Sequence, residues 1–395
     1  MRTARRAGNV IKKEKIKLKK NKTLPSNFSD LIELGDVEQL KKVFNKCELT
    51  AYVRGYYKDT ALHFYGVPYE FMKWMLDRGY DPNTMSTYNV PLRYNLYDIK
   101  KVKLLLDYGA DINYRCYNNN TPLHYLCDGN PPIENLKFFL QNGADINARN
   151  NNNETPLLYA IKRRRTPETR FVQMIETMLE EHSKIKKNSL LDKLRKINRH
   201  PIPDKDWIVA QKEITRIGKS HEFYKMQIED ENLRNETNVN MKRLYEIFEV
   251  EPVPERVMAT ENSIIKVTST DWTKQYNELW NLLVPGRGRA EFLQGEAIRL
   301  IGKLSYEVLD MGCINWDKDF RKLVKAYKLL ISYGNQLDKE DYDNVVSCLE
   351  DIKWLGEDQF NFVEEKTVEW ILKNPKPVKL TDFKNVDFIK LDYMR

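Results

Sequence analysis

The chain has 395 residues, of which 41% are hydrophobic and 31% are charged, and its formal net charge is +8. This length exceeds what one ordinary core supports, so two domains, or an elongated array plus a domain, are expected. The composition excludes a wholly disordered chain, and no apolar run reaches the length of a membrane span. The five cysteines form no C-x-x-C pair. This argues against disulfides and structural zinc and favours a cytoplasmic protein.

Residues 1–25 form a basic N-terminal segment. Positions 1–23 hold ten Lys or Arg residues and one acidic residue, which leaves a net charge of −1 for the rest of the chain. Such a segment can bind phosphate or anionic lipid through contacts that weaken with salt. The simpler interpretation is a disordered, solubilising tail. We expect a disordered tail at 1–25, with salt-dependent nucleic acid binding through residues 1–23 left open.

A short motif recurs between residues 59 and 158. It reads DTALH at 59–63, VPL at 90–92, NTPLH at 120–124 and ETPLL at 154–158, and its leucines are 30, 31 and 34 residues apart. A second motif follows the same period, with RGYDPN at 78–83, YGADIN at 108–113 and NGADIN at 142–147. The pattern resembles the ankyrin repeat, in which a hairpin and two helices occupy about 33 residues and T-P-L-H opens the first helix.

The recurring residues have physical roles in such a repeat. Thr121 and Thr155 stand where a side-chain oxygen can accept a hydrogen bond from an unpaired N–H of the first helical turn. The prolines that follow them occupy the first helical position, where a missing N–H costs nothing. Three glycines mark the left-handed residue that ends each second helix, a conformation that glycine adopts without a Cβ penalty: Gly79, Gly109 and Gly143.

We expect the array to span residues 26–187, with about five units including its two caps. Residues 28–44 predict a first helix pair that lacks T-P-L-H. In the last unit, from 155 to about 187, the expected Gly-Ala-Asp-Ile becomes His-Ser-Lys-Ile at 182–185. The change indicates the end of the array, because terminal repeats depart from the pattern.

The resemblance implies a binding surface made of hairpin tips and the concave face. Tyrosine and arginine dominate interface energetics, so residues of these types near the tips are the strongest candidates. The predicted partner-binding residues are Tyr57, Met85, Tyr88, Arg115, Tyr117, Asn118, Asn151 and Glu154. The alternative is that the aromatic side chains only pack neighbouring hairpins together.

The five histidines predict no metal site and no cofactor. His63 and His124 occupy the T-P-L-H position, where the resemblance implies a structural hydrogen bond between adjacent hairpins. His182, His200 and His221 show no H-x-x-x-H spacing.

The remainder predicts a basic linker or helix at 188–205, a helical domain at 206–380 and a tail at 381–395. A positive patch near the end of the array is the alternative for the linker. Expected helices cover 206–229, 239–249, 271–284, 290–311, 317–333, 339–353 and 365–373, with Trp272, Tyr276, Leu279, Trp280 and Leu283 as a core face. The β-branched run at 263–269 predicts a strand, with a partner near 251–257. The fold class is therefore mainly α: an ankyrin-repeat solenoid followed by a mostly helical domain with a small β element.

A glycine- and arginine-containing loop at 285–290 leads into a predicted helix. Such a loop can bind an anion at a helix N-terminus through Arg287 and Arg289. It lacks the G-K-[ST] ending of a P-loop, so a turn with a structural Glu296–Arg299 pair is the simpler interpretation, and a catalytic centre is a third.

The C-terminal half also carries the segments QGE at 294–296 and NWD at 315–317, after a tryptophan-containing helix at 272–283. In these segments it resembles the C-terminal region of uncharacterised bacterial or phage ankyrin-repeat proteins, which implies architecture and origin but no activity. The leading hypothesis is a non-catalytic, cytoplasmic adaptor or inhibitor that binds a protein partner. The alternative is a protein that binds nucleotide or nucleic acid through the tail and the loop at 285–290.

Overall fold

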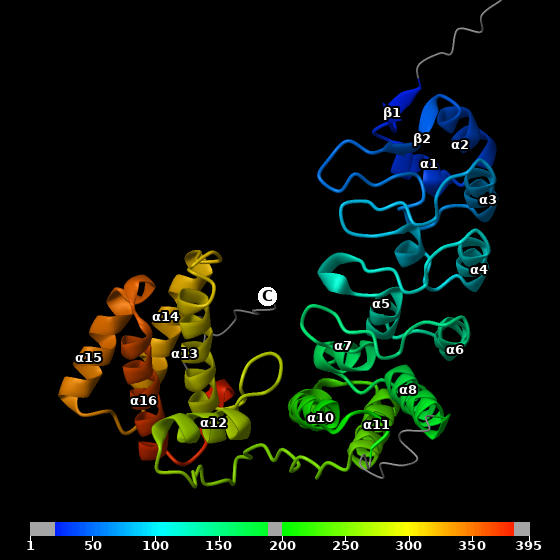
Figure 1. The fold of residues 1–395 in the computed structure, drawn as a ribbon. Coiled ribbons are helices and arrows are strands. Elements are labelled where there is room, and N and C mark those ends of the chain that lie inside the picture. The colour runs from blue at the N-terminus through cyan, green and yellow to red at the C-terminus, as the bar shows by residue number, and fades with distance from the viewer. Residues whose placement is uncertain (1–19, 189–199, 383–395) are drawn as a thin grey trace, which may run out of the picture. The chain divides into compact units, whose positions relative to one another are not determined.

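The computed structural model describes residues 20–188 and 200–382, which divide into two compact units (Figure 1). The N-terminal unit comprises the described residues through Arg164 together with Arg170–Ala210. The C-terminal unit comprises Arg165–Thr169 and the described residues from Gln211 onward. Among the described residues, no helix has the length and apolar composition needed to cross a membrane.

The N-terminal unit is a stack of helix pairs and hairpins. Figure 1 shows α3, α4 and α6 along one side of this stack, while the hairpin loops project on the other side. Its elements are β1 (Asn21–Thr23), α1 (Phe28–Leu34), α2 (Val37–Phe44), β2 (Cys47–Tyr52), α3 (Tyr69–Asp77), α4 (Ile99–Asp107), α5 (Pro122–Asp128), α6 (Ile133–Gln141), α7 (Pro156–Arg163) and α8 (Thr169–Asn188). Helix α10 (Asp204–Tyr224) begins in this unit.

The predicted helix-ending glycines are confirmed. Gly79, Gly109 and Gly143 have φ values of 85°, 91° and 86°. At each glycine two backbone bonds close the helix end; after α3, for example, Tyr80 N donates to Met75 O at 3.1 Å. His182, which replaces the glycine in the last unit, continues helix α8 instead of ending it.

The first helices are less regular than the repeat pattern predicts. In the units separated by 30 and 31 residues, the chain after Thr60 forms turns and Pro91–Tyr94 forms a short 3-10 helix, so the expectation of α-helices there is wrong. Both units are shorter than the 34-residue unit, which has room for α5. Thr155 caps α7 as predicted, by accepting from Leu158 N at 3.3 Å. Thr121 caps α5 through a capping box, in which the Thr121 side chain faces the backbone N–H of His124 and the His124 ring accepts from Thr121 N at 3.1 Å.

The first unit carries a strand pair that the sequence did not predict. Strand β1 runs parallel to β2, with Asn21 N donating to Lys46 O and Leu24 N donating to Tyr52 O, both at 2.9 Å. Leu24 is buried, so this segment packs onto the first unit. The predicted tail therefore does not extend to residue 25; its residues 1–19 lie outside the described part of the chain.

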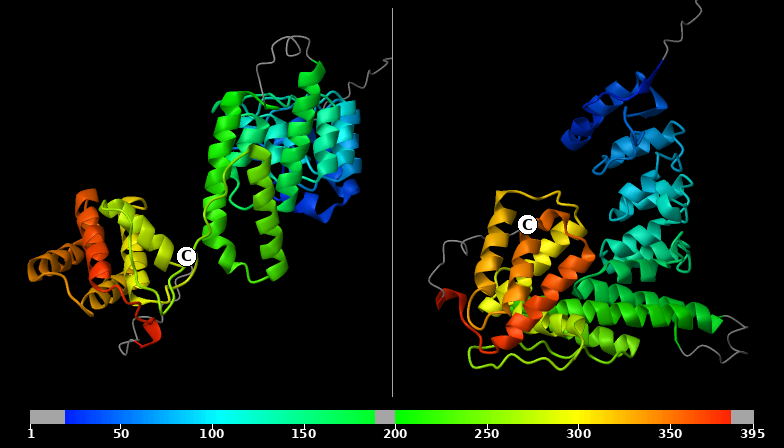
Figure 2. Two further views of the ribbon diagram at one scale, coloured as in Figure 1. Left: turned by 90° about the horizontal axis from the view of Figure 1, so that it is seen from below. Right: turned by 90° about the vertical axis from the view of Figure 1, so that its left-hand side faces the viewer.

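The C-terminal unit is helical, and α13 packs against α12, α14 and α16 (Figures 1 and 2). Its elements are the rest of α10, α11 (Glu231–Phe248), α12 (Trp272–Leu283), α13 (Leu293–Leu309), α14 (Lys318–Ile331), α15 (Lys339–Glu350) and α16 (Glu357–Lys373), with short 3-10 turns at Lys225–Gln227, Ile352–Trp354 and Leu380–Asp382. The core contains Leu279 and Leu283 of the predicted α12 face together with Ile301, Tyr327 and Trp370.

The predicted strand at 263–269 is wrong, because residues 250–271 contain no strand. Their backbone groups bond elsewhere: Thr268 N and Ser269 N donate to the Glu278 carboxylate, and Ile265 N donates to Pro375 O at 2.8 Å. The small two-stranded sheet of this protein is the β1–β2 pair instead. Most of the predicted linker, residues 189–199, and of the C-terminal tail, residues 383–395, lie outside the described residues.

Candidate partner-binding surface

The ends of four hairpins form a continuous edge of the N-terminal unit. We call residues 54–58, 85–88, 115–119 and 149–153 the hairpin tips. Main-chain hydrogen bonds join each tip to the next: Thr87 N donates to Tyr57 O at 2.8 Å, Tyr117 N donates to Tyr88 O at 2.9 Å, and Asn151 N donates to Asn118 O at 3.0 Å. Because these bonds fix the tips relative to one another, the edge is organised before any partner binds.

Four tyrosines gather on the first three tips, and we call them the tyrosine cluster: Tyr56, Tyr57, Tyr88 and Tyr117. Tyr88 lies between the others, 6.0 Å from the rings of Tyr56 and Tyr57 and 5.0 Å from that of Tyr117. Tyr56, Tyr57 and Tyr117 remain 71%, 60% and 62% exposed. The rings therefore pack neighbouring hairpins together, as the alternative interpretation holds, and still offer a large aromatic surface to solvent.

Four more of the predicted contact residues lie on the same edge. Met85 and Arg115 are exposed, and so is Asn151, whereas Asn118 is partly buried in a left-handed conformation with φ 57°. Arg115 also has a structural role, because its Nη1 donates to Asn119 O at 3.3 Å and to Arg149 O at 3.0 Å. The structure thus brings seven of the eight predicted residues onto one edge.

Glu154, the eighth, is not available to a partner. It is 5% exposed, and its carboxylate accepts a bond from Asn150 Nδ2 at 3.1 Å. It also forms ion pairs with Lys162 at 3.1 Å and Arg163 at 3.3 Å. Burial raises the pKa of Glu154, but the bonds from Asn150 and Lys162 and the two cations outweigh it and hold the pKa below its usual value. We correct the prediction: Glu154 is a buried ion-pair partner within the array.

The sequence analysis missed aromatic residues that recur at one position of the repeat. The residue two positions after each repeated leucine is aromatic in all four units: Phe64, Tyr94, Tyr125 and Tyr159. This regular spacing could have predicted from the sequence that these side chains share one position of the repeat. Arg93 lies over the Tyr125 ring at 4.2 Å, Arg163 lies over the Tyr159 ring at 3.4 Å, and the 65%-exposed Tyr65 contacts Tyr94 at 5.2 Å.

The predicted structural role of His63 and His124 is confirmed. Nδ1 of His63 accepts from Thr60 N at 3.3 Å, and its Nε2 is 3.0 Å from Asn89 O on the next hairpin. His124 makes the equivalent bonds with Thr121 N and Glu154 O. Each ring is therefore neutral, with its proton on Nε2. Burial lowers the pKa of His63 to about 4, which keeps this arrangement intact at neutral pH.

The loop at 285–290 offers little to an anion. Arg287 is exposed and Arg289 partly buried, and both precede α13. The Glu296 carboxylate already lies at this end of the helix, where it accepts from Ala290 N at 3.1 Å and from Arg299 Nε at 2.8 Å. The structural pair predicted for Glu296 and Arg299 is present, whereas the anion site stays a prediction without support from the geometry.

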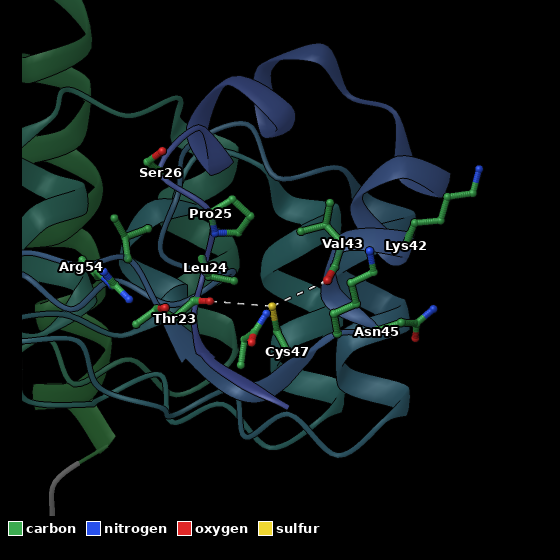
Figure 3. A pocket seen from close by; sticks show the side chains of 12 residues that line it. Thr23, Leu24, Pro25, Ser26, Lys42, Val43, Asn45, Cys47 and Arg54 are labelled. Carbon is green, nitrogen blue, oxygen red and sulfur yellow. Dashed lines mark hydrogen bonds between the residues drawn. The ribbon is translucent and has the colours of Figure 1, made fainter. Parts of the chain in front are cut away.

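A pocket of about 1080 Å³ opens beside the first hairpin tip, between residues 23–26 and the end of α2 (Figure 3). The Cys47 thiol lies at its floor, 3.9 Å from Thr23 O and 3.6 Å from Val43 O. Burial raises the pKa of this thiol, so it stays protonated at neutral pH. Three of the lining side chains are cationic, Lys42, Lys46 and Arg54, and none is acidic.

Within residues 20–188 and 200–382, no group of three or more His, Cys, Asp or Glu side chains is placed to hold a metal ion. The two remaining histidines with polar or stacking contacts have structural surroundings: His221 Nε2 lies 2.9 Å from Asn238 Oδ1, and the His200 ring stacks on Trp207.

Stacked helix pairs with hairpins along one edge and left-handed glycines at the helix ends define a helical repeat solenoid. Residues 57–150 and 93–189 match the family model described as ankyrin repeats in three copies. Over these residues the chain is therefore similar to arrays of ankyrin repeats. No curated protein matches the chain. The match includes neither the α1–α2 pair nor the helices α10–α16, so the likeness of residues 272–317 to bacterial or phage proteins stays a prediction.

Proposed function

We propose that this protein is a non-catalytic adaptor or inhibitor whose ankyrin array binds a protein partner through its hairpin tips and inner face. One observation carries the proposal: the tyrosine cluster exposes most of three aromatic rings on tips that main-chain bonds hold together. Large exposed aromatic side chains on a rigid surface are typical of interface hot spots. The contact residues proposed are Tyr57, Met85, Tyr88, Arg115, Tyr117, Asn118 and Asn151.

The geometry suits a protein surface better than a small molecule. The tips form an extended edge, whereas small ligands are held in concave sites that bury most of their surface. Tyrosine supplies both apolar area and a hydroxyl, and it loses little conformational entropy on binding. The proposal includes a cytoplasmic location, which the odd number of cysteines favours.

Crosslinking mass spectrometry on captured partners tests the proposal. Full-length protein is compared with a Tyr88→Ala, Arg115→Ala, Tyr117→Ala variant and with Tyr69→Ala, a matched control at an exposed tyrosine on α3. We expect crosslinks that place the partner at the tips, loss of capture by the triple variant and unchanged capture by the control.

Tyr88 and Arg115 also stabilise the hairpins, so loss of capture could reflect misfolding. The single variant Tyr57→Ala, at an exposed side chain, separates the two causes. Its thermal unfolding midpoint is measured together with capture, so that loss of binding can be told from loss of folding. Capture that survives in both the triple and the single variant contradicts the proposal.

A further inference from the structure

The first three hairpin tips carry positive charge and contain no carboxylate. Residues 54–58, 85–88 and 115–119 contain Arg54, Lys58 and Arg115, all exposed, and no Asp or Glu. Arg54 also lines the pocket in Figure 3, where Lys42 and Lys46 add two more exposed cations. Five exposed cations therefore extend from the pocket along the tips, next to the tyrosine cluster.

Carboxylates lie beside the pocket cations: Glu38 is one helical turn before Lys42 and pairs with Lys41, and Glu48 follows Lys46 by two residues. The carboxylates nearest in sequence to the tips, by contrast, have other partners. Asp59, which follows the first tip, is partly buried and lies 3.5 Å from the Tyr94 hydroxyl, on the inner face. Glu154 is buried against Lys162 and Arg163. On the fourth tip the only charged residue, Arg149, is paired with Asp206 at 2.6 Å, so this arginine is not counted among the five.

From this charge distribution we infer that the partner segment recognised by the hairpin tips is an acidic stretch of polypeptide, with Asp or Glu side chains near apolar ones. The inference rests on the proposed function and specifies the partner of the same surface. Arg54, Lys58 and Arg115 pair with the acidic side chains, while the tyrosine rings cover the apolar ones. Phenol hydroxyls such as those of Tyr57 and Tyr117 donate hydrogen bonds to carboxylates.

The ring geometry favours polypeptide over single-stranded nucleic acid. Nucleic-acid-binding surfaces stack successive bases on open aromatic faces along a dense basic groove. In the tyrosine cluster the ring planes meet at 50–82°, so the rings lie edge to face with one another and present no row of parallel faces. Of the five cations, only Lys58 and Arg115 lie on the tips away from the pocket, so no dense row of cations follows the tyrosine rings.

Selection from a random peptide display library tests the inference on the full-length protein. We expect the selected peptides to be enriched in Asp and Glu relative to the starting library. A synthetic peptide from the selection should bind about tenfold more weakly to an Arg54→Gln, Lys58→Asn, Arg115→Gln variant at low salt, because interface charge pairs are lost. Asn is used at position 58 because its φ of 51° suits Asn.

The matched control is Lys100→Gln, Lys103→Gln, Lys137→Gln, which removes the same charge from exposed positions on α4 and α6. This variant should bind the peptide like the parent protein. Because Arg115 bonds to two carbonyls, the double variant Arg54→Gln, Lys58→Asn is measured as well, with unfolding midpoints for all variants.

The outcomes separate the two proposals. Selected peptides without acidic enrichment, or equal binding by the tip and control variants, overturn the acidic-partner inference while leaving a protein-binding array in place. Failure to select any peptide, together with absence of partner crosslinks, overturns the proposed function itself. Binding of a 20-nucleotide single strand that is lost in the tip variant, without peptide binding, assigns the surface to nucleic acid instead.

Discussion

Tyr88 and Tyr117 meet edge to face across two neighbouring hairpins, with ring centroids 5.0 Å apart and planes at 78°. The same two residues are joined through the backbone, because Tyr117 N donates to Tyr88 O. One contact therefore stabilises the array and shapes its exposed edge. Variants at the two positions should differ, because Tyr88 contacts three rings and Tyr117 contacts one of the cluster.

We predict that Tyr88→Ala lowers the free energy of unfolding by about 2 kcal/mol and Tyr117→Ala by about 1 kcal/mol, since an aromatic pair contributes roughly 0.5–1.5 kcal/mol beyond area burial. Urea unfolding followed by circular dichroism measures both values. Equal losses at the two positions would show that the central place of Tyr88 has no energetic consequence.

The left-handed glycines give a second prediction. Gly109→Ala should lower the free energy of unfolding by about 1 kcal/mol, because the residue has φ 91° and an L side chain is strained there. No atom lies within 4 Å of the position of an added Cβ, so the cost is conformational rather than steric. The control is Gly109→Asn, which tolerates a left-handed backbone better and should cost less.

Buried histidines make the N-terminal unit sensitive to acid. Burial lowers the pKa of His63 and of His182 to about 4, against roughly 6.5 in an unfolded chain. The unfolded state therefore binds more protons between these values, and stability present above about pH 6.5 is lost as the pH falls toward 4. For each histidine, the free energy of unfolding should fall by about 1 kcal/mol between pH 7 and pH 5.5.

Urea titrations at the two pH values measure this loss, and imidazole NMR titrations assign it to individual rings. A His63 resonance that titrates near its unperturbed pKa would contradict the prediction.

The corrected role of Glu154 predicts a large effect on stability. Glu154→Ala should lower the free energy of unfolding by on the order of 3 kcal/mol, because it leaves Asn150 and the two nearby cations without their buried partner. If Glu154 were a partner contact, its removal would instead weaken binding with little change in stability. Comparison of the unfolding midpoint with capture of the partner distinguishes these results.

In the C-terminal unit, Arg256 holds the end of α12. Its guanidinium donates to Asn281 O at 2.6 Å, Trp280 O at 3.2 Å and Val284 O, and it lies 4.2 Å over the Phe223 ring. Arg256→Met should lower the free energy of unfolding by about 2 kcal/mol and speed amide hydrogen exchange at the end of α12, because three carbonyls lose the bond from this guanidinium. Lys325→Met, at an exposed lysine on α14, should leave this exchange unchanged.

Patterns with a local physical cause were predictable from the sequence. The glycines at 79, 109 and 143 need a left-handed backbone, and Glu296 and Arg299 are one helical turn apart, so both features appear as expected. The absence of the first α-helices was harder to predict. The motif at 59–63 is present, although the short unit lacks room for a full helix. Helix α16 begins at Glu357, eight residues before its predicted start, and Gln359 Oε1 accepts from Gly356 N at 2.9 Å there.

Long-range pairings escaped prediction for a different reason. Strand β1 is three residues long and pairs with β2 across 26 to 29 residues of sequence, so no periodic pattern predicts it. The burial of Glu154 depends on Lys162 and Arg163, eight and nine residues further on in α7, and on Asn150 in its own hairpin. At the candidate site, the sequence located the tips correctly but could not distinguish an exposed side chain from one that the next repeat covers.

The affinity of an identified partner for tip variants tests the central claim most directly. Isothermal titration calorimetry compares the parent protein with Tyr57→Ala, Tyr117→Ala and with the control Tyr69→Ala. The account predicts binding at least about tenfold weaker for the double variant, as expected for interface hot spots, and unchanged binding for the control. Equal affinity of all three proteins would contradict the claim that the hairpin tips bind the partner.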